Sequence, residues 1–411
     1  MKYVDEFRDG AVAGKLAERV TRAVEPGRRY NFMEFCGGHT HAISRYGVTD
    51  LLPREIRMVH GPGCPVCVLP IGRIDNAIEL AARPEVILCT YADTMRVPAS
   101  DRLSLTKAKA KGADIRMVYS AADALRIARE NPAREVVFFA IGFETTTPPT
   151  ALAILQADRE NLANFRVFCN HVLTPAAIAN ILESPQVRDI GTVPLEGFVG
   201  PAHVSCVIGS QPYEYFAEEY GKPVVIAGFE PLDVMQAVLM LVEQVNEGRA
   251  EVENEFTRAV TREGNVKAKV LVAEVFELRR SFEWRGLGEV PYSALAIKPK
   301  YARFDAEAHY GIKYRSVPDN KACECGAILR GAKEPRDCKV FGTVCTPENP
   351  IGSCMVSSEG ACAAYYSYGR FREQLRTLED EHEGVPQAEA ATPVPDVAGA
   401  RGGATEPTAT T

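Results

Sequence analysis

The sequence lacks the features of a membrane, secreted or nucleic-acid-binding protein. It contains no uncharged apolar run of about 18 residues, the length that spans a bilayer. Lys2, Asp5 and Glu6 stand where a secretory signal peptide would be apolar. The chain has no long run of Lys or Arg, and its net charge of −7 is opposite to the usual charge of a nucleic-acid-binding domain. We expect a cytoplasmic protein without membrane or nucleic-acid partners.

Cysteine is the most informative residue type. Twelve cysteines in 411 residues are too few for a disulfide scaffold, and in a reducing compartment such groups more often bind metal or perform thiol chemistry. Three lie early in the chain, at Cys36, Cys64 and Cys67. Six more crowd between residues 323 and 362. The remaining three, Cys89, Cys169 and Cys206, stand in apolar surroundings, and we expect them to be structural.

Short β-rich segments alternate with segments of helical periodicity from residue 31 to about residue 228. This alternation predicts an α/β fold with mostly parallel sheets covered by helices. The expected strands are 31–35, 56–60, 85–90, 115–119, 135–141, 165–169, 204–208 and 223–228. The expected helices are 74–82, 121–128, 150–158, 175–182 and 231–247, with helical character continuing over 251–262.

Composition suggests four regions. We expect a first α/β lobe over residues 1–132, a second over 133–250, a C-terminal region over 251–382 and a disordered tail over 383–411. Cys, Gly and Pro dominate residues 318–369 of the C-terminal region. The order of that segment must come from something other than a hydrophobic core, and metal ligation is the simplest source.

The early cysteines belong to two glycine-rich motifs. Residues 36–41 read Cys-Gly-Gly-His-Thr-His after an expected strand, and at most one of His39 and His41 can face the thiols. Residues 61–67 read Gly-Pro-Gly-Cys-Pro-Val-Cys between an expected strand and helix, a junction that favours a low thiol pKa and dithiol–disulfide exchange. The alternatives are a structural zinc site formed with Cys36 and a histidine, or a turn around inert thiols.

Two further candidates follow expected strands. Glu144 and three threonines follow the strand 135–141, at the edge where ligand sites of open α/β sheets gather. Glu144 is a candidate acid/base or positioning group; alternatively it caps the helix that begins near Pro148. His203 stands immediately before the expected strand 204–208, and a structural role is an equal alternative for this single histidine.

The late cysteines are Cys323, Cys325, Cys338, Cys345, Cys354 and Cys362. Their spacing matches neither paired zinc knuckles nor the bacterial ferredoxin pattern. A metal centre is still the expectation, because six thiols are enough for a [4Fe–4S] cluster and leave two over for a redox pair. Zinc and disulfides are the alternatives.

In their order along the chain, the segments 36–41, 61–67, 142–146, 201–205, 323–326 and 345–350 resemble the motifs of the HypD family of hydrogenase maturation factors. The resemblance covers about residues 10–375. It implies an iron–sulfur scaffold on which the Fe(CN)2(CO) unit of [NiFe]-hydrogenase is assembled. It also implies a small chaperone, HypC, a thiocyanate-bearing cyanide donor, HypE, and delivery toward the hydrogenase large subunit.

The same resemblance implies roles for individual residues. Cys36 would bind the assembly iron, together with a cysteine of the chaperone. Cys64 and Cys67 would supply or relay electrons, and the C-terminal module would hold a [4Fe–4S] cluster. Thiolates suit iron that carries cyanide and carbon monoxide, and a dithiol that closes to a disulfide supplies the two electrons needed to release cyanide from a thiocyanate. Glu144 and His203 would position the donor or move protons.

Among the late cysteines, we expect Cys323, Cys338, Cys345 and Cys362 to ligate the cluster, with Cys325 and Cys354 as a redox pair. The expected protein is a redox-active assembly scaffold rather than a multiple-turnover enzyme. Two hypotheses compete with it. One is an iron–sulfur-linked thiol–disulfide oxidoreductase, and the other is a zinc-stabilised interaction protein.

Overall fold

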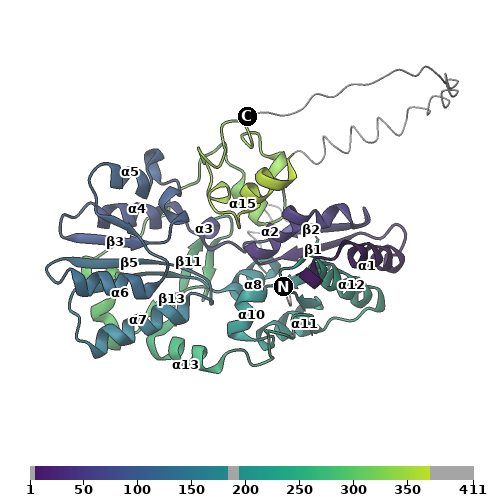
Figure 1. Cartoon of the computed structure of the whole chain (residues 1–411), viewed down its shortest axis with the longest axis horizontal. Helices are drawn as coiled ribbons and strands as arrows, with labels where there is room; N and C mark the ends of the chain where they lie inside the picture. The colour runs from purple at the N-terminus through teal and green to yellow at the C-terminus, as the bar shows by residue number, and fades with distance from the viewer. Residues whose placement is uncertain (1–4, 184–193, 371–411) are drawn as a thin grey trace, which may run out of the picture. The chain divides into compact units, whose positions relative to one another are not determined.

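Two parallel β-sheets form the framework of the computed structural model, which describes residues 5–183 and 194–370 (Figure 1). The first sheet has the order β2-β1-β7-β8-β9 and the second the order β4-β3-β5-β6. All pairings within them are parallel, which confirms the expected α/β class. The strands are β1 (Tyr30–Glu34), β2 (Ile56–His60), β3 (Val86–Thr90), β4 (Ile115–Met117), β5 (Glu135–Gly142), β6 (Phe165–His171), β7 (Gly197–Gly200), β8 (Val224–Ile226) and β9 (Val252–Asn254).

Helices cover both sheets. In Figure 1, α4 and α5 lie on one side of β3 and β5, and α6 and α7 lie on the other. The helices around the sheets are α1 (Gly10–Ala23), α2 (Gly37–Tyr46), α3 (Pro65–Val68), α4 (Ile71–Ala81), α5 (Leu105–Ala110), α6 (Ala121–Glu130), α7 (Thr147–Arg159), α8 (Thr174–Glu183), α10 (Ala202–Ile208), α11 (Glu214–Tyr220), α12 (Pro231–Glu247) and α13 (Val266–Val275). Among the described residues, none of the helices has the length and apolar composition to cross a membrane.

The C-terminal third consists of short elements. Two antiparallel pairs, β10 (Phe276–Leu278) with β13 (Leu295–Ile297) and β11 (Ser281–Trp284) with β12 (Gly288–Pro291), precede the cysteine-rich module. That module contains α15 (Cys325–Leu329), η8 (Ser353–Met355) and α16 (Ala361–Ala364), joined by turns. The last part of the expected C-terminal region, residues 371–382, and the expected tail 383–411 lie outside the described residues.

The two sheets divide the chain differently from the expected lobes. The chain forms β1 and β2, crosses to the second sheet for β3 to β6, and returns to the first sheet for β7 to β9. The expected boundary between residues 132 and 133 therefore falls inside the second sheet, between β4 and β5. The reason is long-range pairing: Glu34 of β1 lies opposite Val199 of β7, and no local change in composition marks that return.

One expected strand is a helix. Residues 204–208 belong to α10, which follows Pro201, and the Ser205 hydroxyl donates to the Pro201 carbonyl oxygen at 2.6 Å within its first turn. The strand of this region is β7, a short segment bounded by two glycines that carries little β signal. The prediction of helical character over 251–262 was also wrong: this segment begins with β9, which pairs with β8, and continues in turns.

Alternate residues of the strands face different cores, as the pleat of a strand requires. Phe32 of β1 faces a core closed by α1 and α12, whereas the next residue, Met33, faces a central core. Phe138 of β5 faces a core under α6 and α7, and Phe139 faces the central core. The central core therefore joins one face of each sheet. It also contains seven cysteines, namely Cys64, Cys67, Cys325, Cys338, Cys345, Cys354 and Cys362.

Candidate functional site

The carboxyl ends of strands from both sheets meet around one cavity of about 250 Å³. This is the edge at which open parallel sheets bind ligands, and here two sheets contribute to it. Polar and reactive lining residues come from the segments after β1, β3, β5 and β7 and from the cysteine-rich module. They are Cys36, Tyr91, Asp93, Thr94, Thr145, Thr146, His203 and Glu359.

Cys36 ends the segment after β1 and is the N-cap of α2. Its thiol is free and almost completely buried. Burial raises the pKa of the Cys36 thiol to about 12, and the nearby carboxylates of Glu359 and Glu34 act in the same direction. The backbone N–H groups of Gly38 and His203 face the sulfur and oppose this shift. The sulfur thus lies between the first turns of α2 and α10, where amide donors favour a thiolate once its proton is lost.

Glu34 fixes the backbone on which Cys36 sits. This carboxylate is fully buried, and it accepts a hydrogen bond from the Cys36 N–H at 2.9 Å. It also accepts one from the Thr40 hydroxyl, and it pairs with Nδ1 of His60 at 2.9 Å. Because Thr40 belongs to α2 and His60 ends β2, Glu34 ties the end of β1 to both neighbours. The sequence analysis missed Glu34, although a carboxylate at the end of an apolar strand beside a cysteine motif was a usable signal.

The two cysteine motifs are in direct backbone contact. The Gly37 N–H donates to the Gly63 carbonyl oxygen at 3.0 Å. A Cβ on Gly63 would lie 2.5 Å from the Cys36 backbone nitrogen, so only glycine allows this approach. The structure therefore brings Cys36 next to the segment that carries Cys64 and Cys67.

Cys64 and Cys67 form a disulfide across the short helix α3. Cys64 is the N-cap of this helix, Pro65 is its first residue, and the Cys67 N–H donates to the Cys64 sulfur at 3.2 Å. Both cysteines are buried in the central core. The pair is thus an oxidised dithiol at a strand-to-helix junction, the location that the sequence predicted.

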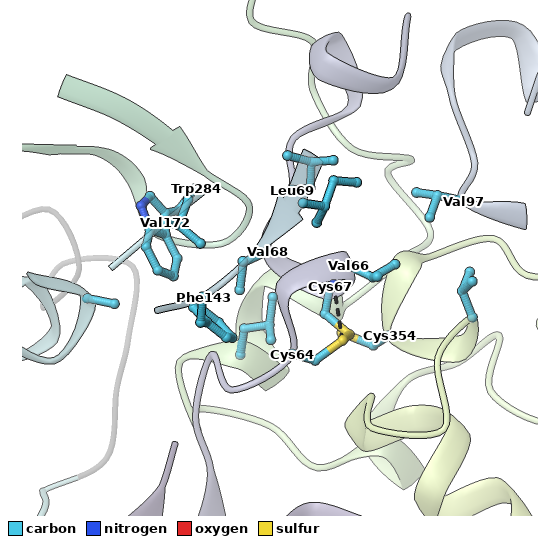
Figure 2. Close-up of a cluster of buried hydrophobic side chains, with 14 of the residues drawn as sticks. Cys64, Val66, Cys67, Val68, Leu69, Val97, Phe143, Val172, Trp284 and Cys354 are labelled. Atoms are coloured by element: carbon cyan, nitrogen blue, oxygen red, sulfur yellow. Dashed lines mark hydrogen bonds between the residues drawn. A yellow bond between two sulfur atoms is a disulfide. The ribbon is translucent and has the colours of Figure 1, made fainter. Parts of the chain in front are cut away.

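The cysteine-rich module docks on α3 through η8. The Ser353 hydroxyl donates to the Cys67 carbonyl oxygen at 2.9 Å, and the Cys67 sulfur lies 3.9 Å from the Ser353 carbonyl oxygen. Figure 2 shows Cys354 beside the Cys64–Cys67 disulfide. The module thus contacts the segment of the disulfide through η8.

The six late cysteines lie together in this module. Cys325 is in side-chain contact with Cys323, Cys354 and Cys362. Cys345 is close to Cys323 and Cys338, and its sulfur accepts a hydrogen bond from the Ile351 N–H at 3.4 Å. The two cysteines predicted as a redox pair, Cys325 and Cys354, therefore touch each other, but both also touch Cys362, which was predicted as a ligand.

The donor chemistry of this module fits an iron–sulfur cluster. Six thiols are gathered, five of them buried, in a segment with few regular elements. As the side chains stand in the described part of the chain, no three His, Cys, Asp or Glu residues are arranged to hold a metal ion. The thiols of the late cysteines contact one another instead. Thiolates are the donors that iron–sulfur clusters use.

Of the two predicted histidines, only His203 lines the cavity. His203 lines the cavity and packs against Phe229, with ring centroids 4.2 Å apart. Burial lowers the pKa of His203. His39 is fully buried behind the cavity, where its Nε2 lies 3.0 Å from the carbonyl oxygens of Ala227 and Gly228. His39 also packs on Phe229, so the same phenyl ring contacts both histidines.

Glu144 is directed away from the cavity lining. Its carboxylate accepts hydrogen bonds from the Thr174 N–H at 2.9 Å and from the Thr174 hydroxyl at 3.1 Å. Thr174 is the first residue of α8, so Glu144 binds the start of α8 rather than the start of α7 beside it in the sequence. Burial raises the pKa of Glu144 to about 7.

Two carboxylates in the cavity were missed by the sequence analysis. Asp93 follows β3, and Glu359 reaches Gly37 from the cysteine-rich module. Burial raises the pKa of Glu359, and the negative charges of Asp93 and Glu34 contribute. Neither carboxylate belongs to a motif with the cysteines that it faces, so only the folded chain shows their proximity.

Comparison with known proteins gives one consistent family. The family model HypD, described as "Hydrogenase formation hypA family", matches residues 11–369. The chain is 73% identical over 373 residues to the hydrogenase maturation factor HypD of Cupriavidus necator, which covers 91% of this chain and 98% of that protein. It is 46% identical over 373 residues to HypD of Escherichia coli K12, covering 90% of this chain and 98% of the relative. The chain therefore belongs to the HypD family of hydrogenase maturation factors.

Proposed function

We propose that this maturation factor is the scaffold on which the Fe(CN)2(CO) unit of [NiFe]-hydrogenase is assembled. Cys36 holds the iron, which is cargo, with a second thiolate from a HypC-type small chaperone. A HypE-type donor presents thiocyanate to the same cavity, and the finished unit passes toward the hydrogenase large subunit. The single observation that carries this proposal is the contact between the Cys36 and Gly63 backbones, because it brings the free Cys36 thiol next to the segment of Cys64 and Cys67, whose residues Gly63, Pro65 and Val66 line the same cavity.

In this proposal, iron binding and electron transfer belong to different cysteines. The Cys36 sulfur is free and can bind iron, whereas the sulfurs of Cys64 and Cys67 are bonded to each other. Soft thiolates suit low-spin iron that carries cyanide and carbon monoxide. His203 and Glu359 lie on the same cavity and are placed to orient the incoming donor or hold its proton.

The dithiol supplies the electrons for cyanide release. The sulfur–carbon bond of the donor's thiocyanate breaks, cyanide leaves with the bonding pair, and the donor sulfur becomes a thiol. Cys64 and Cys67 give up two electrons and two protons as their disulfide forms. One proton goes to the donor sulfur and the other to cyanide or solvent. The oxidised pair in the structure corresponds to the state after this step.

Returning the pair to its dithiol form needs two electrons. We propose that Cys323, Cys338, Cys345 and Cys362 hold a [4Fe–4S] cluster, which when bound would supply one-electron transfer. Cys325 and Cys354, which touch each other, are the proposed redox pair beside it. The docking of Ser353 on Cys67 gives the module a fixed position against the dithiol.

Infrared spectroscopy tests the scaffold directly. The protein purified anaerobically with its small chaperone is expected to show bands of iron-bound cyanide and carbon monoxide. Cys36→Ala is expected to lose these bands while the iron–sulfur absorption persists, because the late cysteines are untouched. Cys206→Ala, which alters a half-buried thiol elsewhere, is the matched control. Retention of the bands in Cys36→Ala would contradict the assignment of Cys36 as the iron-binding thiolate, whereas their absence from the wild-type complex would favour a general thiol–disulfide oxidoreductase.

A further inference from the structure

The turn between β11 and β12 contacts both the helix of the disulfide and the cysteine-rich module. The Arg285 N–H donates to the carbonyl oxygen of Val68, the last residue of α3, at 2.8 Å. The Gly286 carbonyl oxygen accepts a hydrogen bond from the Arg330 guanidinium at 2.6 Å, and a Cβ on Gly286 would lie 3.0 Å from the Cα of Gly326 in α15. The turn therefore connects α3 to α15.

Arg285 places a buried cation at this connection. Only 2% of its side-chain surface is exposed. Its Nε–H donates to the carbonyl oxygen of Leu69, the residue after α3, at 3.1 Å, and its Nη1 pairs with the Asp319 carboxylate at 3.2 Å. Asp319 lies in the cysteine-rich segment 318–369. The guanidinium therefore holds that segment against the residues that follow the disulfide.

The second terminal nitrogen of Arg285, Nη2, has no partner in the described part of the chain. Within residues 5–183 and 194–370, it is buried and forms no hydrogen bond. The backbone N–H, Nε and Nη1 of the same arginine each have a partner. A buried guanidinium N–H without an acceptor is costly, and native structures normally supply one. Nη2 is therefore a donor suited to a group that binds here.

Cys323 of the cysteine-rich module is within electrostatic reach of Arg285. The hydrogen bond with Cys325 is the main cause of the lowered pKa of Cys323, and the positive charge of Arg285 acts in the same direction. The carboxylate of Asp319 acts against it, so the ion pair contributes little net charge there. What Arg285 adds is thus the donor on Nη2. The sulfurs of a cluster bound by the late cysteines are anionic acceptors for such a donor.

We propose that Arg285 is a positioning residue of the electron path, which holds the cysteine-rich module against α3 and donates a hydrogen bond from Nη2 to a sulfur of the bound [4Fe–4S] cluster. This inference rests on the proposed function, which assigns the cluster to the late cysteines. Hydrogen bonds to the sulfurs of such a cluster raise its reduction potential, because reduction adds negative charge that the donor stabilises. Arg285 thereby makes the cluster easier to reduce, at the place where the module meets the helix of the disulfide.

The midpoint potential of the cluster tests this role. It is measured on the anaerobically purified, full-length protein by titration with dithionite, followed by electron paramagnetic resonance. We expect Arg285→Met to shift the potential to a lower value. The double substitution Arg285→Met with Asp319→Asn removes the ion pair without changing its summed charge, so it isolates the lost donor and should also lower the potential. Asp319→Asn alone keeps Nη2 and should not lower it.

Arg280→Met is the matched control. Arg280 is exposed and immediately precedes β11, so its substitution should leave the potential at the wild-type value. If Arg285→Met loses the cluster, Arg285→Lys replaces it in the comparison, because lysine keeps the charge but lacks the forked donors of arginine. A lower potential in Arg285→Lys supports the proposal, and the wild-type potential in that variant overturns it.

The sign of the shift separates a donor from a purely structural contact. A module that is only loosened admits water to the cluster, which stabilises the more highly charged reduced state and raises the potential. An unchanged or raised potential in the double variant, with the iron–sulfur absorption retained, would therefore overturn the proposal. An equal decrease in Arg280→Met would overturn it as well. A wild-type protein without an iron–sulfur signal would contradict the proposed function itself, and this inference with it.

Discussion

Glu34 is the residue on which the geometry around Cys36 depends. A carboxylate with no exposed surface is costly to bury unless its oxygens are fully hydrogen-bonded. Glu34 meets that condition with Cys36, Thr40 and His60. Its burial is therefore compensated by the same contacts that hold the Cys36 loop in place.

Glu34→Ala is expected to lower the free energy of unfolding by about 2–4 kcal/mol, because it leaves buried donors without an acceptor. Glu34→Gln keeps one acceptor oxygen and should lose less. Glu79→Ala, at an exposed position of α4, is the control and should stay within about 0.5 kcal/mol of wild type. Urea unfolding measures all three. Equal midpoints for Glu34→Ala and Glu79→Ala would contradict the assigned role.

Glu144 makes stability depend on pH. Its folded pKa of about 7 lies above the ordinary value for glutamate, so between about pH 4.5 and pH 7 the folded state holds a proton that the unfolded state has released. Stability contributed by this group is therefore lost as pH rises through that window. Glu144→Gln keeps the contacts to Thr174 without the charge.

We expect the stability of Glu144→Gln relative to wild type to increase from pH 5 to pH 8, by an amount on the order of a few kcal/mol. Thermal unfolding of both proteins at four pH values measures the difference, in which the contributions of other titrating groups cancel. Parallel pH profiles would show that Glu144 is ionised in the folded protein already at pH 5.

Among the elements, the contact between α3 and η8 connects the α/β framework to the cysteine-rich module. Ser353 has no exposed surface, and its hydroxyl has the Cys67 carbonyl oxygen as partner. A short helix with two cysteines and a turn-rich module have little regular structure of their own. This hydrogen bond is one of the contacts that set their relative position, together with the packing of the module in the central core.

Ser353→Ala is expected to weaken this docking by about 1–2 kcal/mol, because the Cys67 carbonyl is left without its donor. The predicted consequence is faster proteolysis within residues 318–369 under native conditions, since local opening controls cleavage there. Ser358→Ala changes an exposed serine of the same module and serves as the control. Equal cleavage rates for the two variants would contradict the role of Ser353 in docking the cysteine-rich module.

Elements with strong local signals were predictable from the sequence. The strand 56–60 coincides with β2, and the helix 231–247 coincides with α12, which has proline at its first position and Gly248 with a positive φ of 66° after its end. Val204 to Ile208 has β-type composition but forms α10, because Phe198 and Val199 are the buried pair that completes the sheet. Burial in a sheet depends on distant partners and overrode the local preference.

At the scale of the whole molecule, the site results from long-range pairing. The motifs at 36–41 and 61–67 were recognisable because each is contiguous. Glu359 and Asp93 were not, since their approach to Cys36 depends on how the module and the second sheet pack. Glu144 illustrates the same limit: its partner Thr174 lies on α8, one strand further along the chain, and no local pattern indicates that contact.

The central claim is that Cys36 and the Cys64–Cys67 pair act on the same cargo. A single-turnover experiment tests it most directly. The protein is reduced, loaded with iron and small chaperone, and mixed with the thiocyanate-bearing donor. Infrared bands then report bound cyanide, and differential alkylation with mass spectrometry counts the thiols of Cys64 and Cys67. We predict one Cys64–Cys67 disulfide for each cyanide delivered, and no bands in a folded Cys64→Ser, Cys67→Ser variant. Full cyanide bands while both thiols stay reduced, or in that variant, would contradict the account.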